Sequence, residues 1–209
     1  MIKYFSMIFA SGLILLVAAA GSRAFGQGNP VEGIYVSGFA GLVVLDSTVT
    51  FPATPDRPAG KFVDQGGDGV IFGARVGWGR LVTQHIYVGG EVEGLLPWNV
   101  TSRLNAYGVE YRARLRGEIG AFGRIGWSSD GRNLFFFRAG LVIPTQNFES
   151  VENGNRARTE WTPVPTFGIG AEIPLTASWA ARMDVTYSWP SGVNVIESYR
   201  MNAGLVYRF

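Results

Sequence analysis

The chain of 209 residues contains no cysteine, a single histidine and only two lysines. The absence of cysteine excludes a disulfide scaffold, and one histidine excludes metal sites built from several histidines. Charged residues make up 16% of the chain, whereas about 25% is typical of globular proteins. A chain of this length can bury a core, but it has little charge to spread over a water-facing surface. We therefore expect much of its surface to face something other than water.

Other residue types are abundant. Arginine supplies nearly all of the basic charge, because Lys3 and Lys61 are the only lysines, and glycine occurs 29 times against about 15 at average usage. Apolar residues make up 47% of the chain, which excludes an intrinsically disordered protein. The glycines follow no Gly-X-Y period, which excludes collagen.

The N-terminus has the order of a secretory signal peptide. Lys3 precedes an apolar run over Ile8–Ala20, and small residues with Ala-X-Ala-like spacing follow at 22–26. The alternative is a membrane anchor, but this run is shorter than the ~20 residues that a spanning helix needs. We predict export with cleavage near residues 24–26, which divides the chain into a signal peptide, 1–26, and a mature domain, 27–209.

Cleavage would leave a neutral protein. Residues 1–26 contain two basic residues and no acid, so 18 − 2 = 16 bases face 16 acids in the mature chain. The basic isoelectric point of the whole sequence is therefore no reason to expect nucleic acid as a partner.

Beyond the N-terminal run, apolar and polar residues alternate with a period of two. In 70–79, for example, Phe72 and Trp78 fall on one parity, and Arg75 falls on the other. Eight segments of this kind predict eight strands, at 34–45, 70–79, 86–96, 112–127, 134–143, 166–174, 179–187 and 199–209. The pattern of 34–45 leaves the facing of its residues open.

The connections between these segments are sorted by length. Those after the second, fourth and sixth strands are short: 80–84, 128–133 and 176–178. Those after the first, third, fifth and seventh are long and rich in turn residues: 46–68, 97–107, 145–162 and 188–197. Short periplasmic turns and long extracellular loops are typical of an up-and-down transmembrane barrel.

A soluble lipocalin-like barrel alternates too, with its apolar residues inside, so the side-chain volumes must decide the facing. Large apolar residues crowd the uncharged parity, and most strand glycines fall on the charged parity. The lumen of an eight-stranded barrel is just wide enough to be filled by side chains, so glycines with a few long polar residues belong inside. The sequence therefore predicts an all-β fold, an eight-stranded antiparallel up-and-down transmembrane β-barrel.

On this facing, the polar parity forms the interior of the barrel. The predicted lumen network is Arg75, Glu91, Glu93, Arg112, Arg114, Arg116, Glu118, Arg124, Arg138, Glu172, Arg182, Asp184 and Arg200, with Arg208 at its periplasmic rim. The planar guanidinium binds a carboxylate bidentately and stays charged when partly dehydrated. Such a network would plug the lumen. The alternative is a selectivity ring in an open pore, but aqueous channels usually need about 16 or more strands.

Aromatic residues gather near the segment boundaries, where two interfacial girdles are expected. The predicted interfacial aromatics are Trp78, Trp127, Trp179, Tyr187 and Tyr199, and Trp98, Trp161, Trp189 and Tyr207 also lie near boundaries. For any one of them alone, an ordinary aromatic at a strand end is the alternative interpretation.

Three segments of the chain carry a family resemblance. The hairpin 168–187 joins a Gly-X-Gly-X-Glu strand tightly to a Trp-led Arg-X-Asp strand, and the chain ends in Asn202–Phe209. Arg114-Leu-Arg116 is followed by Gly120, with residues 117–119 inserted into the usual spacing. These segments resemble the small eight-stranded outer-membrane β-barrel family. The resemblance spans roughly residues 31–209 and includes OmpA-transmembrane-like and opacity-like "porin family" surface antigens. It implies that Phe209, supported by Tyr207, is part of the signal read by the barrel-assembly machinery.

Catalytic signals are weak. His85 lies in a short turn on the predicted periplasmic side, and a hydrolytic base needs a nucleophile and an orienting partner beside it. The chain contains no Ser-X-X-Lys, Walker loop or nucleophile elbow. We therefore expect no enzyme, no cofactor and no metal site.

The first functional hypothesis is a monomeric structural or interaction protein of the bacterial outer membrane. Its partners would be outer-membrane lipid and lipopolysaccharide, the barrel-assembly machinery, and host or surface ligands that contact loops 46–68 and 146–162. The runner-up is a narrow porin-like channel for small solutes or ions. A lipid-modifying membrane enzyme, with His85 as its base, is the third class.

Overall fold

The computed structural model describes residues 30–51, 53, 55, 58–62, 66–106, 109–129, 131–150, 156–157, 163–189 and 195–209. The predicted signal peptide, 1–26 with cleavage near 24–26, and Trp161 lie outside these residues. In the part of the chain that the structure describes, no helix is long and apolar enough to cross a bilayer.

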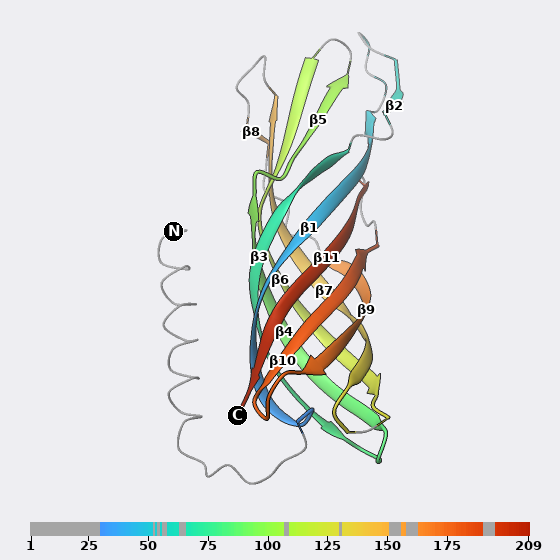
Figure 1. Cartoon of the computed structure of the whole chain (residues 1–209). Helices are drawn as coiled ribbons and strands as arrows, with labels where there is room; N and C mark the ends of the chain where they lie inside the picture. The colour runs from blue at the N-terminus through green and yellow to red at the C-terminus, as the bar shows by residue number, and fades with distance from the viewer. Residues whose placement is uncertain are drawn as a thin grey trace.

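Eight long antiparallel strands form the body of the molecule (Figure 1). They are β1 (Gly33–Phe51), β3 (Gly67–Leu81), β4 (Ile86–Trp98), β6 (Val109–Trp127), β7 (Leu134–Ser150), β9 (Val164–Pro174), β10 (Trp179–Ser188) and β11 (Val195–Arg208). Each pairs with the next in chain order, and β11 pairs with β1 from Tyr35↔Arg208 to Thr48↔Val195. The sheet therefore closes into a barrel, and the predicted eight-stranded fold is confirmed.

Three short strands extend the barrel at one end, β2 (Gly60–Phe62), β5 (Thr101–Ala106) and β8 (Arg156–Ala157). They pair with β1, β6 and β7 and project together at the top of Figure 1. The sequence predicted only loops in these places. The described connections at the opposite end are short, at 82–85, 128–133 and 175–178.

The two faces of the barrel wall differ as the alternation predicts. Phe72 of β3 is 49% exposed and Ile169 of β9 is 65% exposed, although both are large and apolar. Arg75, which lies on the opposite parity of β3, is 1% exposed. In β1, whose facing was open, Tyr35 and Phe39 point inward. An apolar outer wall around a polar interior is the arrangement of a transmembrane barrel.

Glycines make room for the interior charges. Six interior charged residues lie directly opposite a glycine on the neighbouring strand: Glu91↔Gly77, Arg124↔Gly89, Glu93↔Gly120, Arg138↔Gly168, Asp184↔Gly170 and Arg182↔Gly204. Since a lumen of eight strands is just wide enough to be filled by side chains, a glycine opposite each of these six residues helps to keep the total volume within that limit.

A β-bulge in β6 reverses the facing of its upper half. The pairing of β6 with β7 shifts between Leu115 and Gly117, so that Arg116 is one extra residue. Because side chains alternate with a period of two, one extra residue turns the following positions to the other face. Leu115 is therefore buried, whereas Arg114 and Arg116 are exposed.

This bulge overturns part of the predicted network. Arg112, Arg114 and Arg116 do not lie in the lumen but on the outer surface of the wall. The strand beside them is also irregular: β4 pairs with β6 as far as Leu95, Asn99 has a φ of 58°, and β5 resumes the pairing at Thr101. The buried side chain of Val100 lies at this break.

Candidate functional site

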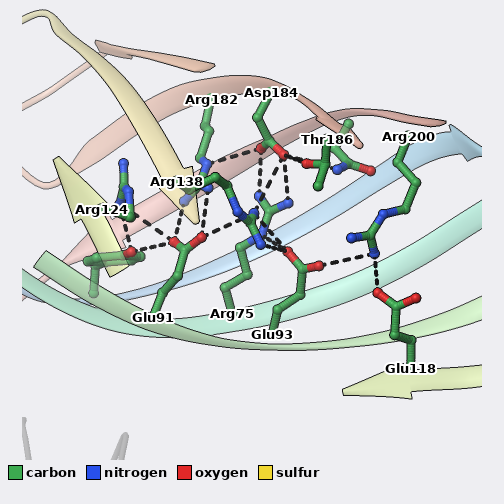
Figure 2. A network of polar contacts seen from close by, with 12 residues as sticks. Arg75, Glu91, Glu93, Glu118, Arg124, Arg138, Arg182, Asp184, Thr186 and Arg200 are labelled. Atoms are coloured by element: carbon green, nitrogen blue, oxygen red, sulfur yellow. Dashed lines mark hydrogen bonds and ion pairs between the residues drawn. The ribbon is translucent and has the colours of Figure 1, made fainter. Parts of the chain in front are cut away.

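Eleven charged side chains form one network inside the barrel, most of them drawn in Figure 2. Six are arginines: Arg75 (β3), Arg124 (β6), Arg138 (β7), Arg182 (β10), Arg200 and Arg208 (both β11). Five are acids: Glu91 and Glu93 (β4), Glu118 (β6), Glu172 (β9) and Asp184 (β10). Every one of these side chains is less than a tenth exposed. Charges this deeply buried are stable only when they are paired and hydrogen-bonded.

Glu93 accepts hydrogen bonds from three arginines. Its Oε2 accepts from Nε of Arg75 at 2.6 Å and from both terminal nitrogens of Arg138 at 3.0 Å each. Its Oε1 accepts from Nη1 of Arg200 at 3.4 Å. One carboxylate of β4 thus contacts the neighbouring strand β3 and two strands that do not pair with β4, β7 and β11.

Glu91 occupies the next inward position of β4. Arg182 binds it bidentately, with Nη1 donating to Oε2 at 2.7 Å and Nη2 donating to Oε1 at 3.0 Å. The hydroxyl of Tyr35 donates to Oε2 at 2.6 Å and accepts from Nη1 of Arg124, also at 2.6 Å. The Tyr35 hydroxyl therefore bridges Arg124 and Glu91, a role that the sequence did not reveal.

Asp184 lies opposite these two glutamates. Arg75 donates to its two oxygens at 2.9 and 3.1 Å, and Nε of Arg182 donates to Oδ2 at 3.1 Å. The amide of Asn202 donates to Oδ1 at 3.0 Å. Asn202 shares its parity with Arg200, a signal that could have placed it in the lumen but could not have identified its partner.

The network ends in two outer pairs. Toward the short turns, Glu172 accepts from Nη2 of Arg124 at 2.5 Å and from Arg208. Toward the end that carries β5, Glu118 accepts from Arg200. Arg208 therefore belongs to the network itself rather than only to its rim.

Aromatic rings fill the space between the charges. The guanidinium carbon of Arg138 lies 3.5 Å from the centre of the Phe122 ring, that of Arg124 lies 4.0 Å from Phe136, and that of Arg75 lies 4.0 Å from Phe39. Stacking on a ring face is favourable for a guanidinium, and more so where water is excluded.

Apolar side chains cover the network at both ends. Toward β5, a cluster is formed by Phe39, Val43, Leu45, Ile71, Leu95, Val100 and Leu115. Toward the short turns, a second cluster is formed by Val31, Tyr87, Leu134 and Phe136, with Leu81 packed against it. Val31 precedes β1, so the chain folds under the barrel before its first strand begins. The network therefore lies between two groups of buried apolar side chains.

The interior charges are paired with one another. Guanidinium groups hold the carboxylate oxygens, and no group of three or more acids or histidines among the described residues could hold a metal ion. His85 lies far from the network in the turn after β3, where its Nδ1 is 3.0 Å from the carbonyl oxygen of Ser128.

Ten of the thirteen predicted lumen residues are brought together by the structure: Arg75, Glu91, Glu93, Glu118, Arg124, Arg138, Glu172, Arg182, Asp184 and Arg200. Arg112, Arg114 and Arg116 are the three that are not, because of the bulge. The six glycines opposite the charges were visible as an excess on the polar parity, but the partner of each charge depends on the strand register.

The predicted interfacial aromatics lie on the outer wall in two groups. Trp127 and Trp179 are about half exposed beside the short turns, where the Trp179 ring centre is 5.0 Å from that of Tyr207. At the other end of β10, the ring centre of Tyr187 lies 4.9 Å from that of Tyr199. Trp78 is 49% exposed near the end of β3.

The predicted assembly signal lies at the short-turn end of the barrel. The rings of Tyr207 and Phe209 are 5.0 Å apart, and the backbone N–H of Phe209 donates to the carbonyl oxygen of Ile34 on β1. The recognition of these two residues by the assembly machinery stays a prediction.

Comparison with known proteins defines the class of fold. No protein-family model and no curated protein matches the chain. Among solved structures, Neisserial surface protein A matches with a TM-score of 0.54 at 12% identity, covering 85% of this chain and 97% of that one. The outer membrane protein OprG from Pseudomonas aeruginosa matches with a TM-score of 0.52 at 10% identity, covering 88% and 98%. The chain has the fold of the small outer-membrane β-barrels.

Proposed function

We propose that this chain is an integral protein of the bacterial outer membrane whose lumen is closed, and which acts in envelope structure and surface interaction through the end that carries β2, β5 and β8. The observation that carries the closed lumen is the ionic network, buried between two apolar clusters. A permeating ion would have to separate pairs such as Arg182–Glu91. Breaking one such buried pair costs about 3–5 kcal/mol.

The outer membrane as location is supported by three independent features. The outer wall is apolar, the sequence begins with the pattern of a cleaved signal peptide, and the fold is that of Neisserial surface protein A and of the outer membrane protein OprG. The barrel-assembly machinery would read Phe209 and Tyr207 at the end of β11. The protein would act as a monomer without a cofactor.

Interaction would take place at the projecting end. Residues 46–68 and 146–162, which include β2 and β8, are the proposed contact surfaces for host or surface ligands and for lipopolysaccharide. Connections at the end of a rigid barrel are well suited to binding because the scaffold holds them in place.

A narrow porin-like channel is the second candidate, and one observation favours it. The interior is polar and carries six arginines against five acids, a balance of 6 − 5 = +1 that would favour anions. Against it, each of these carboxylates is already held by at least one guanidinium.

Single-channel recording in planar bilayers separates the two candidates. We expect the purified barrel to insert without steady conductance steps, and a variant with Glu91→Ala and Glu93→Ala to conduct, because it lacks the two central carboxylates. Steady steps from the unaltered protein that change with Glu93→Gln would establish the channel instead.

A gel of heated and unheated samples serves as the control for folding, since a folded membrane barrel changes mobility on heating. A protein that fractionates as soluble and shows no such change would overturn the membrane assignment as well.

A further inference from the structure

The upper half of β6 carries a row of arginines on the outside of the barrel. Arg112, Arg114 and Arg116 occupy alternate positions of β6, and Arg103 of β5 lies directly opposite Arg112. All four side chains are exposed. We call these four residues the outer arginine row.

This arrangement carries an electrostatic cost. Like charges directly opposite each other on neighbouring strands destabilise a sheet, and Arg103 faces Arg112 in that way. Arg112 is partly compensated, because its Nε donates to Glu110 at 2.8 Å, a hydrogen bond that lowers the pKa of the Glu110 carboxyl. By register, Glu149 of β7 also lies opposite Arg112. The upper part of the row thus has acidic neighbours.

The lower part of the row is different. Arg114 lies between Thr101 of β5 and Asn147 of β7, so neither register partner is an acid. Arg116 is the extra residue of the bulge and has no register partner on β7. Asp68, exposed on β3, is the acid on the far side of β5. Two guanidinium groups therefore face outward, and neither has an acid as a register partner among the described residues.

The height of Arg114 and Arg116 along the barrel axis places them beside the apolar band of the outer wall. Trp127 is eleven positions beyond Arg116 on β6, and at about 3.3 Å per residue and a tilt of ~40° this corresponds to about 28 Å along the barrel axis. The apolar band of such barrels is about 25 Å tall. On β4, where Leu95 pairs with Glu118, Leu96 and Trp98 mark the upper edge of this band and are 70% and 72% exposed.

We propose that Arg114 and Arg116, with Arg103 and Arg112 above them, bind the phosphate groups of outer-leaflet lipid head groups. The inference rests on the proposed function, because it takes the apolar band to lie in the outer membrane. A guanidinium binds phosphate bidentately, and its aliphatic stem packs along apolar surface while its charged end reaches the head-group level. The bulge creates this site by turning the arginines out of the lumen.

A binding experiment tests the proposal. The purified full-length mature barrel in detergent micelles would be titrated with fluorescent diphosphoryl lipid A. We expect an Arg114→Gln/Arg116→Gln variant to bind about tenfold more weakly or worse, since two charge-assisted contacts are lost. An Arg114→Lys/Arg116→Lys variant keeps the charge but not the planar fork, so it should fall between the two.

Arg80→Gln is the matched control. Arg80 is also an exposed arginine on the outer wall, but it lies at the short-turn end of β3, so its loss should leave binding unchanged. Unchanged heat-modifiable mobility would show that all three variants fold.

Four results would overturn the proposal. The double Gln variant could bind as tightly as the unaltered protein, Arg80→Gln could weaken binding as much, or dephosphorylated lipid A could bind equally well. Displacement of the lipid by heparin or by inorganic phosphate at equal concentration would assign the row to a soluble anion. Conductance is measured in a separate experiment. A negative lipid-binding result therefore does not contradict the proposal of a closed lumen, and a conducting barrel does not contradict the proposal of a lipid site.

Discussion

The two halves of β6 place the same residue type on opposite sides of the barrel wall. Below the bulge, Arg124 is 3% exposed and contacts Glu172, Tyr35 and the ring of Phe136. Above it, Arg114 is exposed beside Thr101. The difference shows that the environment of an arginine is set here by the strand register and not by the residue type.

The two environments also carry different energies. A buried guanidinium loses its hydration and is stable only with several partners, whereas an exposed one keeps its hydration and contributes little. Substitutions below the bulge should therefore affect stability, and substitutions above it should affect binding to the surroundings.

Labelling of single cysteines tests which side of the barrel wall a residue of β6 faces. It has the largest expected effect, because each position should be labelled almost completely or hardly at all. The chain has no native cysteine, so an Arg114→Cys and a Leu115→Cys variant each carry one thiol. We expect a membrane-impermeant maleimide to label the first in the folded barrel and the second only after unfolding, because Leu115 is 8% exposed.

Deletion of Arg116 sharpens this test. Without the extra residue, Leu115 opposite Gln146 and Gly117 opposite Thr145 become a regular ladder, so both facings should be unchanged. Labelling at position 115 in the undeleted chain, with protection at 114, would mean that the alternation continues through the bulge and that the arginines lie inside.

The replacement Glu93→Ala should cause the largest loss of stability. Arg75, Arg138 and Arg200 would then lack a shared carboxylate in the interior, and we expect the free energy of unfolding to fall by about 3–5 kcal/mol. Urea unfolding in micelles, followed by tryptophan fluorescence, measures this change. Glu110→Ala is the control, because its pair with Arg112 is exposed to water and should contribute little to stability. Equal effects of the two replacements would refute the distinction between the halves.

A smaller effect is expected from Gly73→Ala. A Cβ at this position would overlap the ring of Phe39 and the carbonyl oxygen of Gly94, and Phe39 supports Arg75. Overpacking of this kind costs about 1–3 kcal/mol. Gly38→Ala on the outer wall has no atom within 4 Å of its new Cβ, so it should be neutral or stabilise the strand. The same urea titration measures the stability of both variants. A stabilising effect of Gly73→Ala would show that the lumen has spare volume.

Most of the architecture could be predicted because the barrel imposes a strict two-residue period on its strands. The parity of Arg75, Glu91 and Arg182 followed directly from their apolar neighbours. For residues 34–45 both parities are apolar, so only the structure showed that Tyr35 and Phe39 point inward. β2 and β5 were expected to be loops because turn residues surround them and their alternation is short.

The details of the network could not be predicted from the sequence. The parity of a residue tells which side of the wall it faces, but not its height, and the pairing of Arg182 with Glu91 joins strands that are not neighbours. The bulge was hidden for a different reason. Residues 117–119 change the spacing after Arg116, but the charged residues keep even numbers on both sides of the bulge, from Arg112 to Arg124, so the alternation in the sequence shows no break.

The seam between β1 and β11 determines when the molecule can fold. It pairs Tyr35 with Arg208, so the two edges meet only after the last strand has been synthesised. Arg182 and Glu91 are 91 positions apart in the sequence, and Arg75 and Asp184 are 109 positions apart. A high contact order of this kind makes folding slow, and a half-built sheet would present both an unpaired edge and uncompensated charges. The strand that closes the seam also supplies the last two arginines of the network, because Arg200 and Arg208 of β11 bind Glu93, Glu118 and Glu172.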